Sequence, residues 1–294
     1  MRILIYGAGV IGSFYGALFA EAGEDVTLYA RGKRAETLKE HGLQYKKKEK
    51  ILTAPVKVLT VLKEDDLYDL IFLTVRENQL RTALSELKKN HSPTIVTMVN
   101  SLETYDQWEA ICGKGRILPA FPGAGGGFED GILNAALTPS LIQPTTIGKT
   151  DGREQTVAKL MRKAKIPCEI VKDMHIWQIC HLAMVVPIAD AYYEASDPEH
   201  AGSDSRLMRK TADQIKNNFQ TIHKLGNKLS PPKMHLFRIL PSGLTAFVLG
   251  FVFRSEFGDR FMYRHSLKAP DEMHALHEQF YGYINDAKKR REGR

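Results

Sequence analysis

The chain has 294 residues, of which 43% are hydrophobic and 26% are charged. Both fractions are near the average of soluble proteins, so they exclude a disordered tail, a collagen-like chain and a coiled coil. The length suits one large or two ordinary domains.

The three cysteines form no Cys-X-X-Cys pair, which disfavours a disulfide framework, and no His or carboxylate spacing indicates a metal site. A net charge of +7 suits an anionic ligand, but the basic residues are not interleaved with aromatic ones, so we expect no nucleic-acid partner.

No targeting segment is expected. The apolar stretch that follows Met1 and Arg2 ends at Gly7 and is too short for a secretory signal. The uncharged run Ile239–Phe253 is shorter than the roughly 20 apolar residues that a membrane-spanning helix needs. We therefore predict a cytoplasmic protein without a membrane partner. In this run we expect a buried helix, which is a candidate subunit contact of a homodimer.

The N-terminal residues follow a strand–turn–helix–strand pattern. Arg2–Tyr6 is an apolar run typical of a buried parallel strand. A glycine-rich turn follows at residues 7–12, and small apolar residues then continue to Ala22, as expected of a helix that packs on a sheet. Gly23 is suited to end that helix, and Asp25–Ala30 reads as the second strand.

Strands and helices continue to alternate up to about residue 171. The further strands are predicted at residues 56–61, 70–75, 94–99, 117–119 and 168–171. Such alternation predicts an α/β fold, an N-terminal Rossmann domain with a doubly wound, mostly parallel sheet. After residue 172 the strand-like runs give way to helical spacing. We therefore expect a Rossmann domain at residues 1–171 and an all-helical domain for substrate binding and dimerisation at residues 172–294.

The glycine-rich turn is a dinucleotide-binding signal. Gly-X-Gly-X-X-G alone is weak, but here it follows a strand and opens a helix, which is the context that gives it meaning. Gly7 permits the tight turn, Gly9 lets the backbone approach a pyrophosphate, and Gly12 allows close helix packing. The helix N-terminus offers unpaired N–H groups to phosphates.

The end of the second strand indicates which dinucleotide is bound. An NAD site usually carries an acidic residue here, whereas this chain continues from Ala30 to Arg31. Arg31, with Lys33 or Arg34, could pair with a 2′-phosphate. The sequence therefore predicts NADP(H) as the cofactor.

At this point the chain resembles the ketopantoate reductase (2-dehydropantoate 2-reductase) family. The resembling segments are 7–16, 26–31, 42–43, 70–76 with Gln79, 99–103, 123–127, 130–131 and 146–148. The resemblance implies a Rossmann domain and a helical domain that together reduce a 2-oxo acid with NADPH. The candidate cofactor-binding residues are Gly7, Ala8, Gly9, Val10, Ile11, Gly12, Arg31, Thr74 and Asn100. The candidate substrate residues are Arg76 and Gly126. The glycines around Gly126 allow close approach to a ligand or form a mobile loop, and both interpretations stay open.

The helical segment departs from the family pattern. In the family, a catalytic lysine lies two residues after a tryptophan. Here the residue two positions after Trp177 is Ile179. If the segment is aligned on Pro187 instead, Gln178 corresponds to the lysine. We therefore interpret the chain as a divergent member that lacks this lysine. The family's serine and glutamate for substrate binding have no matching motif here.

Reduction of a 2-oxo acid also requires a proton donor. His181 lies one helical turn after Trp177 and could act as the general acid, or it could be a packed, hydrogen-bonded histidine. Asn100 directly follows a predicted strand, where it could orient the nicotinamide ribose or the substrate, or simply end the strand. The leading hypothesis is an NADPH-dependent reductase of an anionic 2-oxo acid or a related carbonyl. The alternative is an NADP(H)-binding regulator that has altered or lost catalysis.

Overall fold

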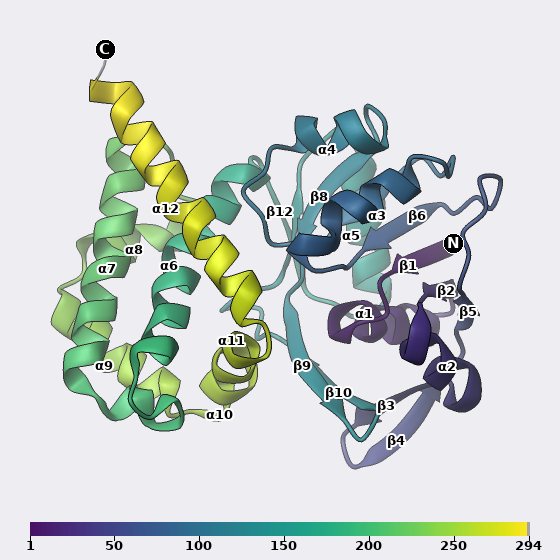
Figure 1. Ribbon diagram of the computed structural model, residues 1–294, viewed down its shortest axis with the longest axis horizontal. Helices are drawn as coiled ribbons and strands as arrows, with labels where there is room; N and C mark the ends of the chain where they lie inside the picture. The colour runs from purple at the N-terminus through teal and green to yellow at the C-terminus, as the bar shows by residue number, and fades with distance from the viewer. Residues whose placement is uncertain (293–294) are drawn as a thin grey trace. The chain divides into compact units, whose positions relative to one another are not determined.

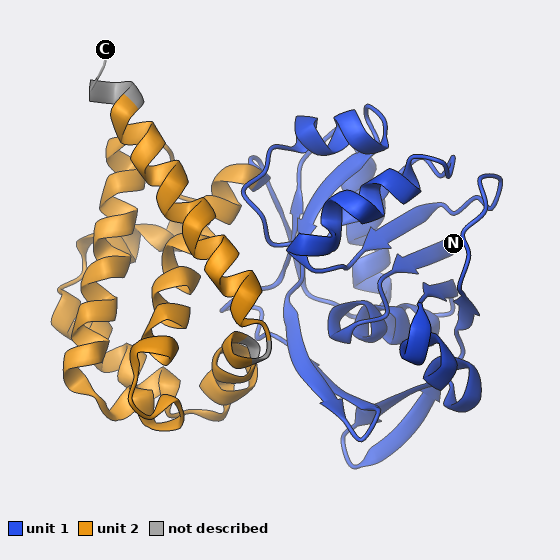
Figure 2. Cartoon of the chain, in the orientation of Figure 1, with its two compact units in different colours: residues 1–174 blue, residues 175–294 orange. Residues whose placement is uncertain are grey.

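The computed structural model describes residues 1–292. The chain divides into two compact units, residues 1–174 and 175–294 (Figure 2). The sequence places the domain boundary after residue 171, and the compact units divide after residue 174.

An eight-stranded sheet organises the first unit (Figure 1). Its strand order is β12-β11-β8-β7-β6-β1-β2-β5. Neighbouring strands run parallel, except that β11 is antiparallel to β8. This confirms the predicted mostly parallel sheet. The strands are β1 (Arg2–Tyr6), β2 (Asp25–Tyr29), β5 (Lys57–Leu59), β6 (Leu70–Leu73), β7 (Ile95–Thr97), β8 (Ile117–Phe121), β11 (Thr145–Gly148) and β12 (Cys168–Val171).

Helices cover both faces of this sheet. Alternate side chains of β1 point to opposite faces, so Ile3 and Ile5 join one hydrophobic cluster and Leu4 and Tyr6 join the other. The first cluster includes α1 (Val10–Glu21), α2 (Gly32–His41) and α5 (Arg153–Lys163), and the second includes α3 (Leu80–Leu87) and α4 (Tyr105–Cys112). The short helix η1 (Glu77–Gln79) precedes α3. The doubly wound arrangement explains why the central strands read as continuous apolar runs.

A second, four-stranded sheet was not predicted. Its order is β4-β3-β10-β9, formed by β3 (Leu43–Lys47), β4 (Lys50–Ala54), β9 (Ala124–Glu129) and β10 (Ile132–Leu137). The glycine run around Gly126 belongs to β9, so its interpretation as a mobile loop is wrong. Gly126 pairs with Ala135, and a Cβ at Gly126 would lie 2.3 Å from the Asn134 carbonyl oxygen. The neighbouring strand therefore accounts for this glycine.

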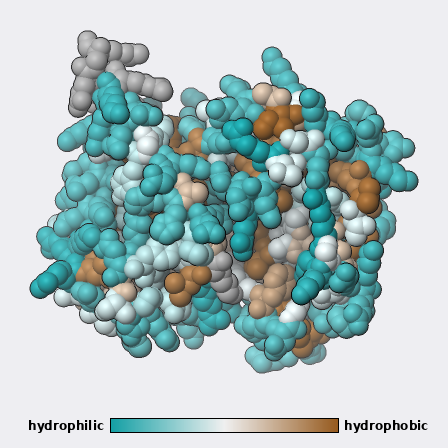
Figure 3. All heavy atoms as spheres, in the orientation of Figure 1, coloured by the Kyte–Doolittle hydropathy of each residue, from teal (hydrophilic) through white to brown (hydrophobic). Residues whose placement is uncertain are grey.

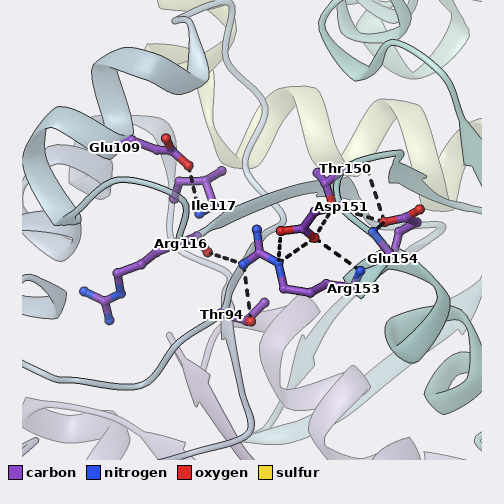
Figure 4. Close-up of polar contacts among 9 residues, drawn as sticks. Thr94, Glu109, Arg116, Ile117, Thr150, Asp151, Arg153 and Glu154 are labelled. Atoms are coloured by element: carbon purple, nitrogen blue, oxygen red, sulfur yellow. Dashed lines mark hydrogen bonds and ion pairs between the residues drawn. The ribbon is translucent and has the colours of Figure 1, made fainter.

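The turn from β11 into α5 fixes that helix against the main sheet (Figure 4). Glu154 accepts hydrogen bonds from the backbone N–H of Gly152 at 2.9 Å and of Thr150 at 3.2 Å, which satisfies donors at the helix start. Asp151 pairs with Arg153 at 2.8 Å, and the hydrogen bond from Arg153 lowers the pKa of Asp151 to about 2. The Arg153 guanidinium extends toward the hydroxyl of Thr94, 3.4 Å away, just before β7.

The described part of the second unit is helical, as predicted (Figure 1). Its elements are α6 (Met174–Glu194), η2 (Pro198–Ser203), α7 (Ser205–Lys224), η3 (Pro232–Met234), α8 (His235–Ile239), α9 (Ser242–Phe253), α10 (Glu256–Gly258), η4 (Asp259–Tyr263), α11 (Arg264–Lys268) and α12 (Pro270–Glu292).

The expectation of a buried helix is wrong for one face of α9. Leu244, Phe247, Val248 and Phe251 are each at least half exposed, while the view in Figure 3 shows hydrophobic side chains only in separate patches on a mostly hydrophilic surface. A subunit contact here stays a prediction. No single helix within residues 1–292 is long and apolar enough to cross a membrane. The segments 232–239 and 242–253 reach that length only together and are bent by 117°.

Helix α6 contains a proline whose effect is compensated by a neighbouring helix. Pro187 has no N–H to donate to the Ala183 carbonyl one turn earlier. Asn218 of α7 donates its side-chain amide to this carbonyl at 3.1 Å, in a buried position. The amide therefore satisfies the backbone group that the proline leaves free.

We predict that Asn218→Ala destabilises the protein by about 1–3 kcal/mol, because it leaves a buried carbonyl without a donor. Urea unfolding followed by circular dichroism measures this change. The neighbouring Asn217 is exposed, so Asn217→Ala serves as the control and should change stability by less than about 0.5 kcal/mol. Equal effects of the two substitutions would contradict the proposed role of Asn218.

Candidate functional site

A cavity of about 580 Å³ lies in the first unit where β1, β2 and β6 end. Ligands of open α/β sheets bind at such carboxyl ends of strands. Several predicted site residues line this cavity together. The lining residues are Tyr6, Gly7, Ala8, Gly9, Tyr29, Ala30, Arg31, Arg34, Thr74, Val75, Arg76, Asn78, Gln79, Thr82, Ala83 and Phe128.

Two glycines of the turn are required by the chain itself. Gly7 has a φ of +113°, which L side chains rarely adopt. A Cβ at Gly12 would lie 2.0 Å from the Gly7 carbonyl oxygen and 2.4 Å from Oγ1 of Thr74. The Thr74 hydroxyl in turn donates to the Gly7 carbonyl at 2.7 Å. Thr74 thus positions the turn as well as lining the cavity.

Gly9 is different, because nothing within the chain requires a glycine there. Its φ of −74° suits any residue, and a Cβ at Gly9 would meet no atom within 4 Å. Gly9 lines the cavity and precedes α1, whose first turn has no side-chain cap. A ligand that approaches the backbone closely would explain this glycine, and the uncapped N–H groups of α1 suit its phosphates.

Two arginines at the cavity have different surroundings. Arg34 donates to the Ala8 carbonyl at 3.0 Å and to the Ser13 hydroxyl at 3.1 Å, so it braces the glycine turn. Burial lowers the pKa of Arg34. Arg76 is exposed, and no hydrogen bond or ion pair engages its guanidinium within the part of the chain that the structure describes. Arg76 is therefore available to an anion in the cavity.

Arg31 is held by two tyrosines and a carboxylate. Its guanidinium donates to the Tyr29 hydroxyl at 3.1 Å and to the Tyr6 hydroxyl at 3.0 Å, and it forms an ion pair with Glu86. The two tyrosine rings are stacked with centroids 4.5 Å apart. Glu86 was not predicted, because it comes from α3 and only the tertiary fold brings it to the end of β2. Tyr6 and Tyr29 could have been suspected, since each is the last residue of its strand.

Five candidate site residues of the first unit lie outside the cavity lining, and one of them, Gly126, belongs to β9. Val10, Ile11 and Gly12 belong to the first turn of α1, where Gly12 packs against the turn and Val10 and Ile11 pack against the core. Asn100, just after β7, is half-buried, and its side-chain oxygen is buried without a hydrogen-bond partner in the described chain. A ligand N–H or hydroxyl would satisfy that oxygen.

The candidate proton donor lies in the second unit, on α6. The His181 ring stacks on Trp177 with centroids 5.2 Å apart and an angle of 8° between the planes. His181 is 7% exposed, and Gln178 and Ile179, the two positions that correspond to the missing lysine, are buried. The stack fixes the imidazole orientation. It suits either a packed histidine or a donor held in one direction.

Comparisons with known proteins show the family of the chain. The family described as ketopantoate reductase PanE/ApbA matches residues 3–149, half of the chain. A 2-dehydropantoate 2-reductase of Archaeoglobus fulgidus is 29% identical over 179 residues, which cover 60% of this chain and 58% of the relative. The match thus spans less than two thirds of that relative's length.

Solved structures share the fold over the whole chain. A putative ketopantoate reductase from Ralstonia solanacearum MolK2 has a TM-score of 0.66 at 14% identity and covers 99% of this chain and 98% of its own. A D-mandelate dehydrogenase with NADH and anilino(oxo)acetate has a TM-score of 0.62 at 16% identity, with coverage of 98% and 99%. At these identities the likeness concerns the fold alone.

We predict that Gly9→Ala changes stability by less than about 0.5 kcal/mol but weakens NADPH binding at least about tenfold, because the new methyl group faces the ligand and not the chain. Calorimetric titration and thermal unfolding measure the two effects. Gly12→Ala is the matched comparison and should destabilise the fold by about 1–3 kcal/mol or more, through overpacking. A Gly9→Ala variant with unchanged NADPH affinity would show that no ligand approaches this turn.

Proposed function

Because the chain belongs to the ketopantoate reductase PanE/ApbA family, we propose that it is an oxidoreductase that uses NADPH to reduce a 2-oxo acid or a related carbonyl. The observation that carries this proposal is the cavity, in which an unhindered Gly9 and three arginines face the same space. Such a donor set suits the pyrophosphate and the extra phosphate of NADPH.

Different residues would hold different parts of the cofactor. The glycine turn, residues 7–12, would bind the pyrophosphate at the start of α1. Arg31, at the end of β2, would pair with the adenosine 2′-phosphate. Arg34 would add positive charge while it keeps the turn in place. Asn100 would use its buried side-chain oxygen to orient the nicotinamide ribose.

When bound, the nicotinamide supplies the hydride, and the chain must supply a proton and a cation for the substrate carboxylate. We assign the proton to His181, whose ring is held by Trp177. We assign the substrate carboxylate to Arg76, which is exposed and lines the cavity. Gly126, which its strand neighbours already explain, would at most border the substrate.

An NADP(H)-binding regulator without catalysis is the alternative, and turnover separates the two. A reductase consumes NADPH in the presence of at least one 2-oxo acid, whereas a regulator binds the dinucleotide and consumes none.

We predict that NADPH binds at least ten times more tightly than NADH, a difference of about 1.4 kcal/mol. Arg31→Ala should remove most of this difference, because the 2′-phosphate loses its cation, and should leave the NADH affinity nearly unchanged. Calorimetric titration measures both affinities. Equal affinities for the two dinucleotides in the unmodified protein would overturn the assignment of NADPH.

We also predict that His181→Ala lowers the turnover rate with an active 2-oxo acid by about 10²–10⁴-fold, the usual contribution of general acid catalysis. The NADPH affinity should hardly change, since the glycine turn and Arg31 provide that binding. His200→Ala is the control, because His200 is exposed and its ring pairs with the exposed Asp197. A His181→Ala variant that keeps more than about a third of the activity identifies His181 as a packing residue.

A further inference from the structure

One carboxylate oxygen near the cavity receives three donors. Oε2 of Glu86 accepts hydrogen bonds from the Tyr6 hydroxyl and, at 3.4 Å, from the Tyr29 hydroxyl. The same oxygen forms the ion pair with Nη2 of Arg31. The Glu86 side chain is 38% exposed and the Arg31 side chain is 55% exposed, so this cluster is open to solvent and the carboxylate has room to move away.

The Arg31 guanidinium, which a 2′-phosphate would need as its partner, already binds the Glu86 carboxylate. A guanidinium flanked by hydroxyl donors suits a phosphate oxygen as well as a carboxylate oxygen. The two anions repel each other at short distance. Burial raises the pKa of Glu86, but the hydrogen bonds from Tyr6 and Arg31 more than offset this effect and leave the pKa below its ordinary value. Glu86 is therefore ionised at neutral pH.

We propose that Glu86 competes with the adenosine 2′-phosphate for Arg31 and thereby sets how strongly the protein prefers NADPH over NADH. This inference rests on the proposed use of NADPH. NADPH binds only after its 2′-phosphate has displaced the Glu86 carboxylate. The free energy needed to break the Arg31–Glu86 ion pair therefore lowers the affinity for NADPH. NADH carries a 2′-hydroxyl and leaves the ion pair intact. Glu86 thus lowers the affinity for NADPH but not for NADH. The preference for NADPH over NADH is then smaller than Arg31 alone would give.

The proposal is tested by calorimetric titration of the full chain and of Glu86→Gln. The probes are NADPH and NADH, with adenosine 2′,5′-bisphosphate and AMP as fragments that differ in the 2′-phosphate. We expect Glu86→Gln to tighten NADPH and the bisphosphate about tenfold, equivalent to about 1.4 kcal/mol, and to leave NADH and AMP within about twofold. Glu49→Gln removes the same charge from an exposed turn between β3 and β4 and should change none of the four affinities.

A second variant, together with thermal unfolding, separates the effect of the carboxylate from a folding defect. Glu86→Asp keeps the charge but retracts it by one methylene group, so NADPH should tighten by a smaller factor than in Glu86→Gln. Thermal unfolding of each variant confirms that it is folded.

An unchanged or weaker NADPH affinity in folded Glu86→Gln overturns the proposal. A loss of NADH affinity with unchanged NADPH affinity also overturns it, since Glu86 would then be a ligand of the ribose hydroxyl. The proposed function fails separately, if the unmodified protein binds neither dinucleotide.

Discussion

The close approach of helix α1 to the glycine turn is the constraint on which the site depends. Gly12 has no room for a Cβ against the Gly7 carbonyl and Thr74, and the Thr74 hydroxyl ties the same carbonyl to the end of β6. This packing places the uncapped start of α1 beside the ends of the central strands. Gly9 is then left on the open side of the turn, where the chain itself needs no glycine. The distinction separates Gly7 and Gly12, which the fold requires, from Gly9, which we propose faces the cofactor.

The cations around the cavity differ in how far the chain already uses them. Arg34 donates to Ala8 and Ser13 of the turn, and Arg31 is paired with Glu86. Among residues 1–292, the guanidinium of Arg76 has no hydrogen-bond or ion-pair partner. An anionic ligand in the cavity would therefore meet three different cations: Arg34, which holds the turn, Arg31, for which it would compete with a carboxylate, and the exposed Arg76. Because the chain engages the three arginines to different extents, they respond differently to the same charge on a ligand, and this difference allows selectivity between ligands.

The sequence predicted the main sheet because its central strands are buried on both faces and read as short apolar runs. The second sheet was not predicted. Its strand β3 is rich in lysine and its strand β9 is rich in glycine, so these segments lack the alternation of apolar residues that marks a strand. Residues 7–9, Arg31, Thr74 and Arg76 could be grouped from the sequence, since they lie in or next to strand ends. Glu86 could not, because only the packing of α3 brings it to Arg31. The end of β2 carries no acidic residue of its own, yet the fold brings one, Glu86 of α3, to Arg31, and the choice of NADP(H) stays a prediction.

The most direct test of this account is the consumption of NADPH, followed by its absorbance, when the protein is given a panel of 2-oxo acids. The account predicts that at least one of them is reduced, with one NADPH consumed per molecule of hydroxy acid formed. Tight NADPH binding without consumption in the presence of any 2-oxo acid or related carbonyl would contradict it and would favour a regulator.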